Sequence, residues 1–261
     1  TVGGALAYAS GSRLQWTLVA NSDASGAASR VAAGNVTVTP GARIDVRFNA
    51  AGGAVGFTDA FWSRQRTWTV INASTRAGSF SLGTVSGDSA GRPLSDFGTL
   101  ELRQVVASVT LVFTPYTPAE LWRRAWFGVD WNNPAISGDA VDGDKDGLSN
   151  LLEYALGTDP NACDPRVAPQ VATGEGKLQI TFTRNAAASD LILSVLAADD
   201  LAGTWTGIAR SAGGAPFETT VTGAAVSEQG SGELKAVKAT DIYLIVDPAH
   251  PKRFLRLAVS R

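Results

Sequence analysis

The stretch Asp142-Gly-Asp-Lys-Asp-Gly-Leu-Ser-Asn-Leu-Leu-Glu153 stands between two strand-rich regions and matches the twelve positions of a calcium-binding loop. Positions one, three and five are aspartates, and position six is Gly147, where the chain must turn sharply around an ion. Position seven offers a backbone carbonyl, position nine often acts through water, and position twelve can give two carboxylate oxygens. The predicted Ca²⁺ ligands are therefore Asp142, Asp144, Asp146, Leu148, Asn150 and Glu153.

An acidic, solvated turn is the alternative interpretation of this stretch. It does not explain why three aspartates crowd together, because their mutual repulsion is costly without a cation. Ca²⁺ is a hard ion that takes about six to eight oxygen ligands, and this loop supplies oxygens at every expected position. Asp139 and Asp159 are further candidate ligands, although nothing in their spacing requires that role.

The flanks of the loop indicate what kind of calcium site it is. Apolar residues over 148–156 predict a short helix, Gly157 suits its C-cap, and Pro160 prevents any continuation. The preceding segment, Pro134–Val141, has no helical pattern, so no helix enters the loop directly. A paired EF-hand sensor that opens a groove is therefore not expected.

The stretch Asp144-Lys-Asp-Gly-Leu-Ser-Asn-Leu-Leu-Glu-Tyr-Ala-Leu-Gly-Thr-Asp-Pro160 resembles the calcium segments of thrombospondin type 3-like repeats and dockerin-like half-sites. In such extracellular bacterial proteins the ion stiffens a junction between modules. The resemblance implies a structural Ca²⁺ held by the loop residues that match the pattern. It also implies a secreted or cell-surface location in a bacterium.

Composition limits the classes of function. The chain has 261 residues, enough for two domains, and its 28 glycines with 18% charged residues favour β structure with many turns. A net charge of −2 gives no basic surface for nucleic acid, and no apolar run is long enough for a membrane helix. The single cysteine, Cys163, excludes an intrachain disulfide. Because the chain has no Met and no signal peptide, we expect it to be a mature or excised piece of a longer protein.

Residues 1–116 show short alternating strands separated by glycine turns, which predict the terminal coils of a parallel β-solenoid with a cap. Two segments, Val36–Phe48 and Leu100–Phe113, share a strand–turn–strand pattern that we interpret as a weak internal repeat. The runs 34–46, 55–62 and 66–70 resemble the ends of large secreted proteins with autotransporter-associated β-strand repeats, common in Verrucomicrobia. This resemblance implies a secreted, non-catalytic passenger.

Aromatic residues gather within the same region, at Phe57, Phe61, Trp62 and Trp68. They predict either a sugar-stacking platform or a hydrophobic plug over the open end of the last coil, and we favour the plug because solenoid ends need capping. Solvent exposure of Trp62, Trp68 and Trp205 distinguishes these alternatives.

Residues 117–165 are predicted to form a helical, calcium-binding connector. Thr117 and Glu120 make a capping box with Pro118 at the first helical position. We expect one helix face to be apolar and packed, the face of Leu121, Trp122, Ala125 and Trp126. Residues 166–261 contain about seven short strands, which predict an Ig-like antiparallel β-sandwich. The strands are expected at 178–183, 191–197, 205–209, 218–222, 234–237, 242–246 and 254–259.

Residues suited to catalysis are few. His250, the only histidine, lies in a proline-bounded loop, and there is no His/Cys cluster or phosphate loop. Paired carboxylates for sugar hydrolysis would have to come from Asp45, Asp59, Asp88, Asp96 and Glu101. The fold predicted is thus mainly β: a parallel β-solenoid terminus, a short helical calcium-binding connector and an antiparallel β-sandwich.

We expect a non-catalytic extracellular module for structure, adhesion or assembly, stabilised by Ca²⁺. Its partner would be a cell-surface or extracellular polymer, or copies of itself, and not nucleic acid. The alternative is a glycan-binding or polysaccharide-degrading β-solenoid fragment.

Overall fold

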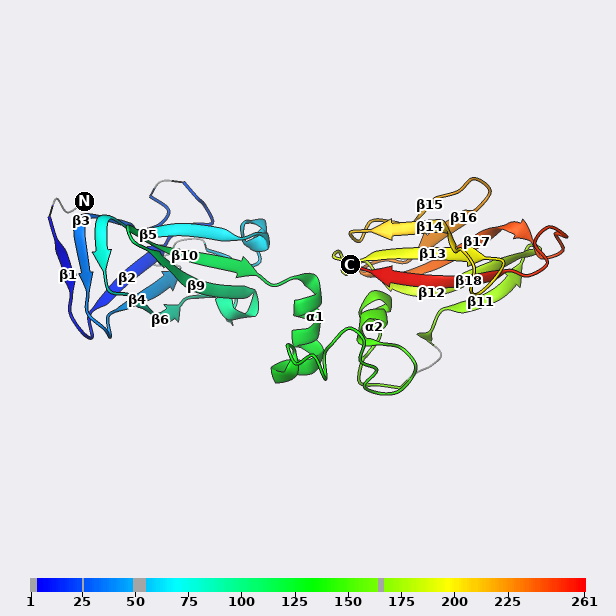
Figure 1. Cartoon of the computed structure of the whole chain (residues 1–261), viewed down its shortest axis with the longest axis horizontal. Helices are drawn as coiled ribbons and strands as arrows, with labels where there is room; N and C mark the ends of the chain where they lie inside the picture. Colours follow the sequence, from blue (N-terminus) through cyan, green and yellow to red (C-terminus); the bar gives the residue numbers. More distant parts are fainter. Residues whose placement is uncertain (1–3, 25, 49–54, 164–166) are drawn as a thin grey trace. The chain divides into compact units, whose positions relative to one another are not determined.

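A computed structural model describes residues 4–24, 26–48, 55–163 and 167–261, and confirms a mainly β chain (Figure 1). The chain divides into two compact units, Thr1–Tyr116 and Thr117–Arg261. The predicted connector belongs to the second unit together with the strands that follow it. The boundary predicted between residues 165 and 166 lies outside the described residues.

The first unit is built on two main sheets (Figure 1). The five-stranded sheet has the order β1 (Leu6–Tyr8), β3 (Val31–Val38), β5 (Arg66–Ala77), β10 (Ser108–Pro115) and β9 (Gly98–Val105). The three-stranded sheet has the order β2 (Arg13–Leu18), β4 (Arg43–Phe48) and β6 (Ser81–Ser86). A short ribbon joins β7 (Asp88–Ser89) and β8 (Arg92–Pro93), and the 3-10 turns η2 (Ala60–Ser63) and η3 (Leu94–Asp96) complete the described elements.

The first six strands alternate between the two sheets as the chain advances. Neighbouring strands within each sheet are parallel from β1 to β3 to β5 and from β2 to β4 to β6. Their register stacks apolar residues on apolar residues, as in Leu14 on Ile44 and Trp16 on Val46. The hairpin of β9 and β10 then adds to β5 in antiparallel fashion.

The predicted internal repeat is not a structural repeat. Val36–Phe48 crosses from one sheet to the other, whereas Leu100–Phe113 folds back on itself as an antiparallel hairpin. The connections explain the difference. Only two residues separate β9 from β10, a length that favours a hairpin. The crossing instead uses four residues that include Pro40 and Gly41, and Gly41 has a φ of +96°.

The aromatic residues lie in the core of the first unit. Trp62 is 3% exposed and Trp68 is 6% exposed, so neither offers a flat surface to a sugar. The Trp62 ring packs edge-on against Phe57 and Phe113, with ring centroids 5.1 and 5.0 Å apart. Its indole nitrogen donates a hydrogen bond to Asn21 at 2.8 Å, which satisfies the one polar atom of the buried ring.

Replacing Trp62 by Ala should therefore destabilise the first unit by about 3–5 kcal/mol, because it removes a buried ring and leaves a cavity. Urea unfolding followed by circular dichroism measures the change. Val106→Ala is the control in the same unit, since Val106 is 74% exposed. A loss of the same size in both variants would contradict the assignment of Trp62 to the core.

In the second unit, two four-stranded antiparallel sheets share one hydrophobic core (Figure 1). One sheet has the order β11 (Gln170–Gly174), β12 (Lys177–Asn185), β17 (Leu234–Leu244) and β16 (Ala225–Gln229). The other has the order β15 (Glu218–Thr219), β14 (Thr206–Ala212), β13 (Ile192–Ala198) and β18 (Phe254–Ser260). We call these two sheets the C-terminal sheet pair.

The predicted strands of this unit need two corrections. The segments expected at 234–237 and 242–246 are one strand, β17, whose pairing with β12 shifts register near Asp241. Asp241 is fully buried there and accepts hydrogen bonds from Arg253, so this charged residue lies inside the sheet. The strands β11 and β16 were not predicted, because both are mostly exposed edge strands without a strong apolar pattern.

Two helices precede the C-terminal sheet pair, α1 (Pro118–Phe127) and α2 (Asn150–Leu156), with the 3-10 turn η4 (Gly128–Asp130) after α1. The capping box of Thr117 and Glu120 is confirmed, as is the left-handed C-cap at Gly157. The predicted packed face of α1 is wrong in part. Trp122 packs on Tyr154 with ring centroids 5.4 Å apart, but Leu121, Ala125 and Trp126 are exposed. This ten-residue helix packs on the core of the unit through Ala119 and Trp122, and the other apolar side chains of the predicted face lie outside that contact.

Candidate functional site

The three loop aspartates converge as predicted. Asp142, Asp144 and Asp146 each offer a carboxylate oxygen, and these oxygens all lie within 4.8 Å of one another. The loop backbone curls around the same side chains. Lys145 and Gly147 donate their N–H groups to Asp142 at 2.8 and 3.1 Å, which fixes that carboxylate on the inside of the turn.

The tight turn depends on two residues with left-handed backbone. Lys145 has a φ of +65° and Gly147 a φ of +94°. Glycine adopts such angles without steric cost, which explains its place at position six of the loop. Leu148 then donates its N–H to Asp146 at 2.8 Å, while its own side chain is buried in the core of the second unit. The loop is thus attached to the core immediately after the turn.

Glu153 of α2 lies close enough to the three aspartates to feel their charge, although it is not among the side chains whose oxygens lie within 4.8 Å of one another. Its side chain is fully buried, and neither of its carboxylate oxygens has a hydrogen-bond partner within the described part of the chain. One oxygen of Asp144, Oδ2, is also buried without a partner there. Buried carboxylates in folded proteins are almost always hydrogen-bonded, paired with a cation or bound to a metal.

Electrostatics at Glu153 reflect the same shortage of partners. Burial, together with the negative charges of Asp144, Asp146, Asp142 and Asp159, raises the pKa of Glu153 to about 7. A bound divalent cation would reverse this balance, since it favours the ionised form of every surrounding carboxylate. The arrangement is therefore suited to an ion that takes several hard oxygen ligands.

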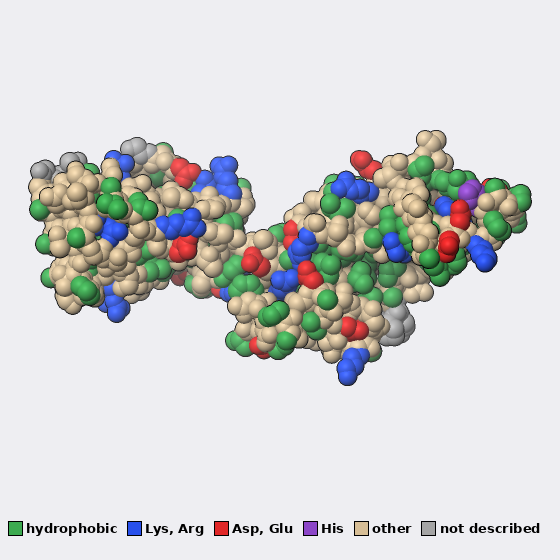
Figure 2. Space-filling view, viewed as in Figure 1, with side chains coloured by type: hydrophobic (Ala, Val, Ile, Leu, Met, Phe, Trp, Pro, Cys, Tyr) green, Lys and Arg blue, Asp and Glu red, His purple; other side chains and the backbone are tan. Residues whose placement is uncertain are grey.

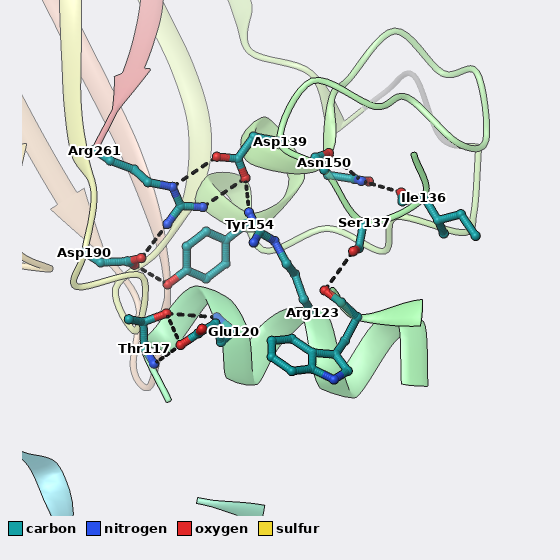
Figure 3. Close-up of polar contacts among 12 residues, drawn as sticks. Thr117, Glu120, Arg123, Ile136, Ser137, Asp139, Asn150, Tyr154, Asp190 and Arg261 are labelled. Carbon is teal, nitrogen blue, oxygen red and sulfur yellow. Dashed lines mark hydrogen bonds and ion pairs between the residues drawn. The ribbon is translucent and has the colours of Figure 1, made fainter. Parts of the chain in front are cut away.

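Asn150 bonds through its amide nitrogen and its backbone to the segment that precedes the loop. Its amide nitrogen donates to the carbonyls of Ile136 at 3.0 Å and Gly138 at 2.9 Å (Figure 3). Its backbone N–H donates to the carbonyl of Val141 at 2.8 Å. These bonds close the base of the loop, because they join the segment before it to the first residue of α2. Its Oδ1 is buried without a hydrogen-bond partner among the described residues.

Of the two further candidate ligands, Asp139 faces arginines. Its carboxylate binds Arg123 of α1 and, at 3.0 and 3.1 Å, Arg261 after β18 (Figure 3). Burial alone would raise the pKa of Asp139, but hydrogen bonds from Arg261 and Arg123 hold it below its usual value. Asp159 accepts the N–H of Asn161 at 2.9 Å and lies near enough to Glu153 to affect its pKa.

The five carboxylates considered for sugar hydrolysis each have a structural partner. They are Asp45 with Arg13, Asp59 with the Phe61 N–H, Asp88 with the Gly91 N–H, Asp96 with Arg92 and Glu101 with Arg103. Trp205 is partly exposed, and the guanidinium of Arg256 lies 4.0 Å from its ring centroid. That cation occupies one face of the ring which a sugar would otherwise use.

Sequence reasoning missed one charged cluster around His250. The imidazole stacks on Tyr243 with centroids 3.5 Å apart, and Nδ1 lies 2.9 Å from Asp199. Arg253 joins Asp199 to the buried Asp241. The cluster connects loops that are about 50 residues apart in sequence, which no local pattern could reveal.

Comparison with protein families, with curated proteins and with solved structures gives no match. No helix in the described ranges combines the length and the apolar character needed to cross a membrane. Basic and acidic side chains are interspersed on the face drawn in Figure 2, without a continuous basic stripe. Any functional assignment therefore rests on the geometry of the loop 142–153.

Glu153→Gln should change stability in opposite directions with and without Ca²⁺. In chelator the variant should melt several degrees higher, because it removes a buried charge from among three aspartates. In Ca²⁺ it should melt lower than the unmodified chain, because it loses a charged ligand. Scanning calorimetry measures both shifts, and Glu218→Gln, an exposed position on β15, controls for the change in net charge. Shifts of the same sign in both buffers would contradict the placement of Glu153 among the ligands.

Proposed function

We propose that this chain is a calcium-binding structural module in which the loop 142–153 holds one Ca²⁺. The observation that carries the proposal is Glu153, a fully buried carboxylate with two unpartnered oxygens beside three converging aspartates. The proposed ligands are the side chains of Asp142, Asp144, Asp146 and Glu153, the carbonyl of Leu148, and Asn150 through water. Asp159 remains a candidate for a further oxygen, whereas Asp139 is engaged by arginines.

The proposed role of the ion is structural and not regulatory. Helix α2 has seven residues, and helices below about 12 residues are marginal alone in water. Five of them, Asn150 and Glu153 to Leu156, are buried, so the helix must be formed for the second unit to pack. A cation bound at the start of the helix would hold Glu153 in the folded arrangement and stabilise the unit by mass action.

Removal of Ca²⁺ should therefore lower the melting temperature of the second unit clearly, and Asp144→Ala should reproduce that loss in saturating Ca²⁺. Calorimetry with and without chelator, together with titration calorimetry of Ca²⁺, measures the effect. Asp200→Ala is the matched control, because Asp200 is an exposed aspartate in a turn of the same unit. An unchanged transition in chelator would contradict the proposal.

The finer architecture is part of the proposal. We assign the first unit to the end of a β-solenoid, supported by the parallel strands that alternate between two sheets. We assign the C-terminal sheet pair to an antiparallel β-sandwich, supported by the shared core. An extracellular location fits a calcium loop of this kind, because Ca²⁺ is abundant there and modules with dissociation constants of about 10⁻⁴–10⁻³ M stay occupied without regulation.

We further propose that the module is non-catalytic and serves adhesion or assembly at the cell surface, with an extracellular polymer or copies of itself as partner. The burial of Trp62 and Trp68 supports this over a glycan platform. A panel of polysaccharides, scored for binding and for cleavage, tests it. We expect no cleavage by the purified chain. Reproducible cleavage that is lost in Asp45→Asn or Asp59→Asn would contradict the proposal, and binding without cleavage would favour a glycan-binding module.

A further inference from the structure

Arg261 connects the last strand of the second unit to two aspartates from different parts of the chain. Its Nε and Nη2 atoms donate to the two carboxylate oxygens of Asp139 at 3.1 and 3.0 Å. Its Nη1 atom donates to Asp190 at 2.6 Å (Figure 3). A planar guanidinium that binds one carboxylate through two atoms and a second through a third atom fixes the orientation of both acids.

Asp139 lies at the entrance of the calcium loop. Its backbone carbonyl accepts the N–H of Leu151 at 3.1 Å, next to the bond between Val141 and Asn150. Its carboxylate also binds Arg123, so α1 takes part in the same contact. Asp139 thus holds the base of the loop through its backbone, while its side chain is held by two arginines.

Asp190 connects Arg261 to the exit of the same loop. Its second oxygen accepts the hydroxyl of Tyr154 at 2.6 Å, and Tyr154 follows Glu153 directly on α2. The Tyr154 side chain is 2% exposed, so α2 has little freedom to rotate while this bond is present. Arg261 therefore acts on both ends of the loop, through Asp139 at its start and through Asp190 and Tyr154 at its end.

We infer that Arg261 is a positioning residue for the calcium loop, and that Ca²⁺ binding and the packing of β18 stabilise each other through it. The inference rests on the proposed calcium function of the loop. A guanidinium has no acceptor atom and cannot itself be a Ca²⁺ ligand. The role inferred for Arg261 is to set the spacing between the loop aspartates and Glu153, which follows them on α2. Because coupling between two sites is reciprocal, a group that holds the loop closed also gains stability when the ion binds.

The direction in which Ca²⁺ affinity changes when Arg261 is replaced distinguishes a positioning role from a simple electrostatic one. Arg261 is a cation near an acidic loop, so removal of its charge alone would strengthen Ca²⁺ binding. Loss of positioning would weaken it. Arg261→Lys is informative for the same reason, because lysine keeps the charge but cannot bind Asp139 through two fixed atoms.

The experiment measures Ca²⁺ affinity by titration calorimetry on the full chain and on three variants. Arg261→Gln and Arg261→Lys should raise the dissociation constant by about fivefold or more, the range of typical coupling between sites. Arg256→Gln is the matched control, since Arg256 is an exposed arginine on β18 that lies over Trp205 and not in this network. The dissociation constant of the control should stay within about twofold of that of the unmodified chain, below the roughly fivefold change at which typical coupling between sites begins.

Hydrogen exchange of β18 supplies a second measurement. In the unmodified chain, Ca²⁺ should slow amide exchange over Phe254–Ser260, and in Arg261→Gln that calcium-dependent protection should be lost while protection of β12 in the other sheet persists. Three results would overturn the inference about Arg261 and leave the proposed function standing. They are equal Ca²⁺ affinities in all three variants, tighter Ca²⁺ binding by Arg261→Gln, and a rate of amide exchange in β18 that does not change with Ca²⁺. Absence of Ca²⁺ binding by the unmodified chain would overturn the proposed function as well.

Discussion

The repulsion among buried and half-buried carboxylates around Glu153 is the constraint on which the second unit depends. Glu153 is fully buried, its oxygens lack partners among the described residues, and three aspartates lie close by. A chain without a counter-ion would relieve this repulsion by protonating Glu153 or by opening the loop, and opening the loop would disturb α2. Tyr154, Ala155 and Leu156 of α2 pack in the core, so the carboxylate of Glu153 cannot move into solvent without disrupting that packing. The proposed divalent cation would instead give these oxygens a partner while α2 stays in the core.

The same helix explains why the loop 142–153 and the C-terminal sheet pair belong to one compact unit. Residues of α2 and Leu148 share a hydrophobic core with Ile180, Val195 and other strand residues. Ion pairs add a polar connection. Arg261, which follows β18, binds Asp139 before the loop and also Asp190, and Asp190 in turn accepts the hydroxyl of Tyr154 after the loop. Apolar packing supplies most of the stability in such an arrangement, and the ion pairs contribute mainly by fixing orientation.

The sequence predicted the features that depend on near neighbours. The convergence of the three loop aspartates, the capping box of Thr117 and the C-cap at Gly157 each follow from residue types at fixed short spacing. Features that depend on distant residues were missed. Arg261 and Asp139 are 122 positions apart, so Asp139 looked like a candidate ligand when it is an ion-pair partner. The edge strands β11 and β16 carry little apolar pattern because most of their residues are exposed.

The internal similarity between Val36–Phe48 and Leu100–Phe113 shows why a strand pattern alone does not fix topology. Both segments alternate apolar and polar residues around a turn, yet one changes sheets and the other pairs with itself. The few residues of the connection determine the topology. The two-residue connection between β9 and β10 brings these strands side by side, whereas the four-residue corner with Gly41 directs the chain from β3 to a second sheet. Alternation determines which side chains are buried, and the connections determine which strands share a sheet. In the first unit, the parallel stacking of β4 on β2 and the antiparallel pairing of β9 with β10 therefore follow from different corners between similar strands.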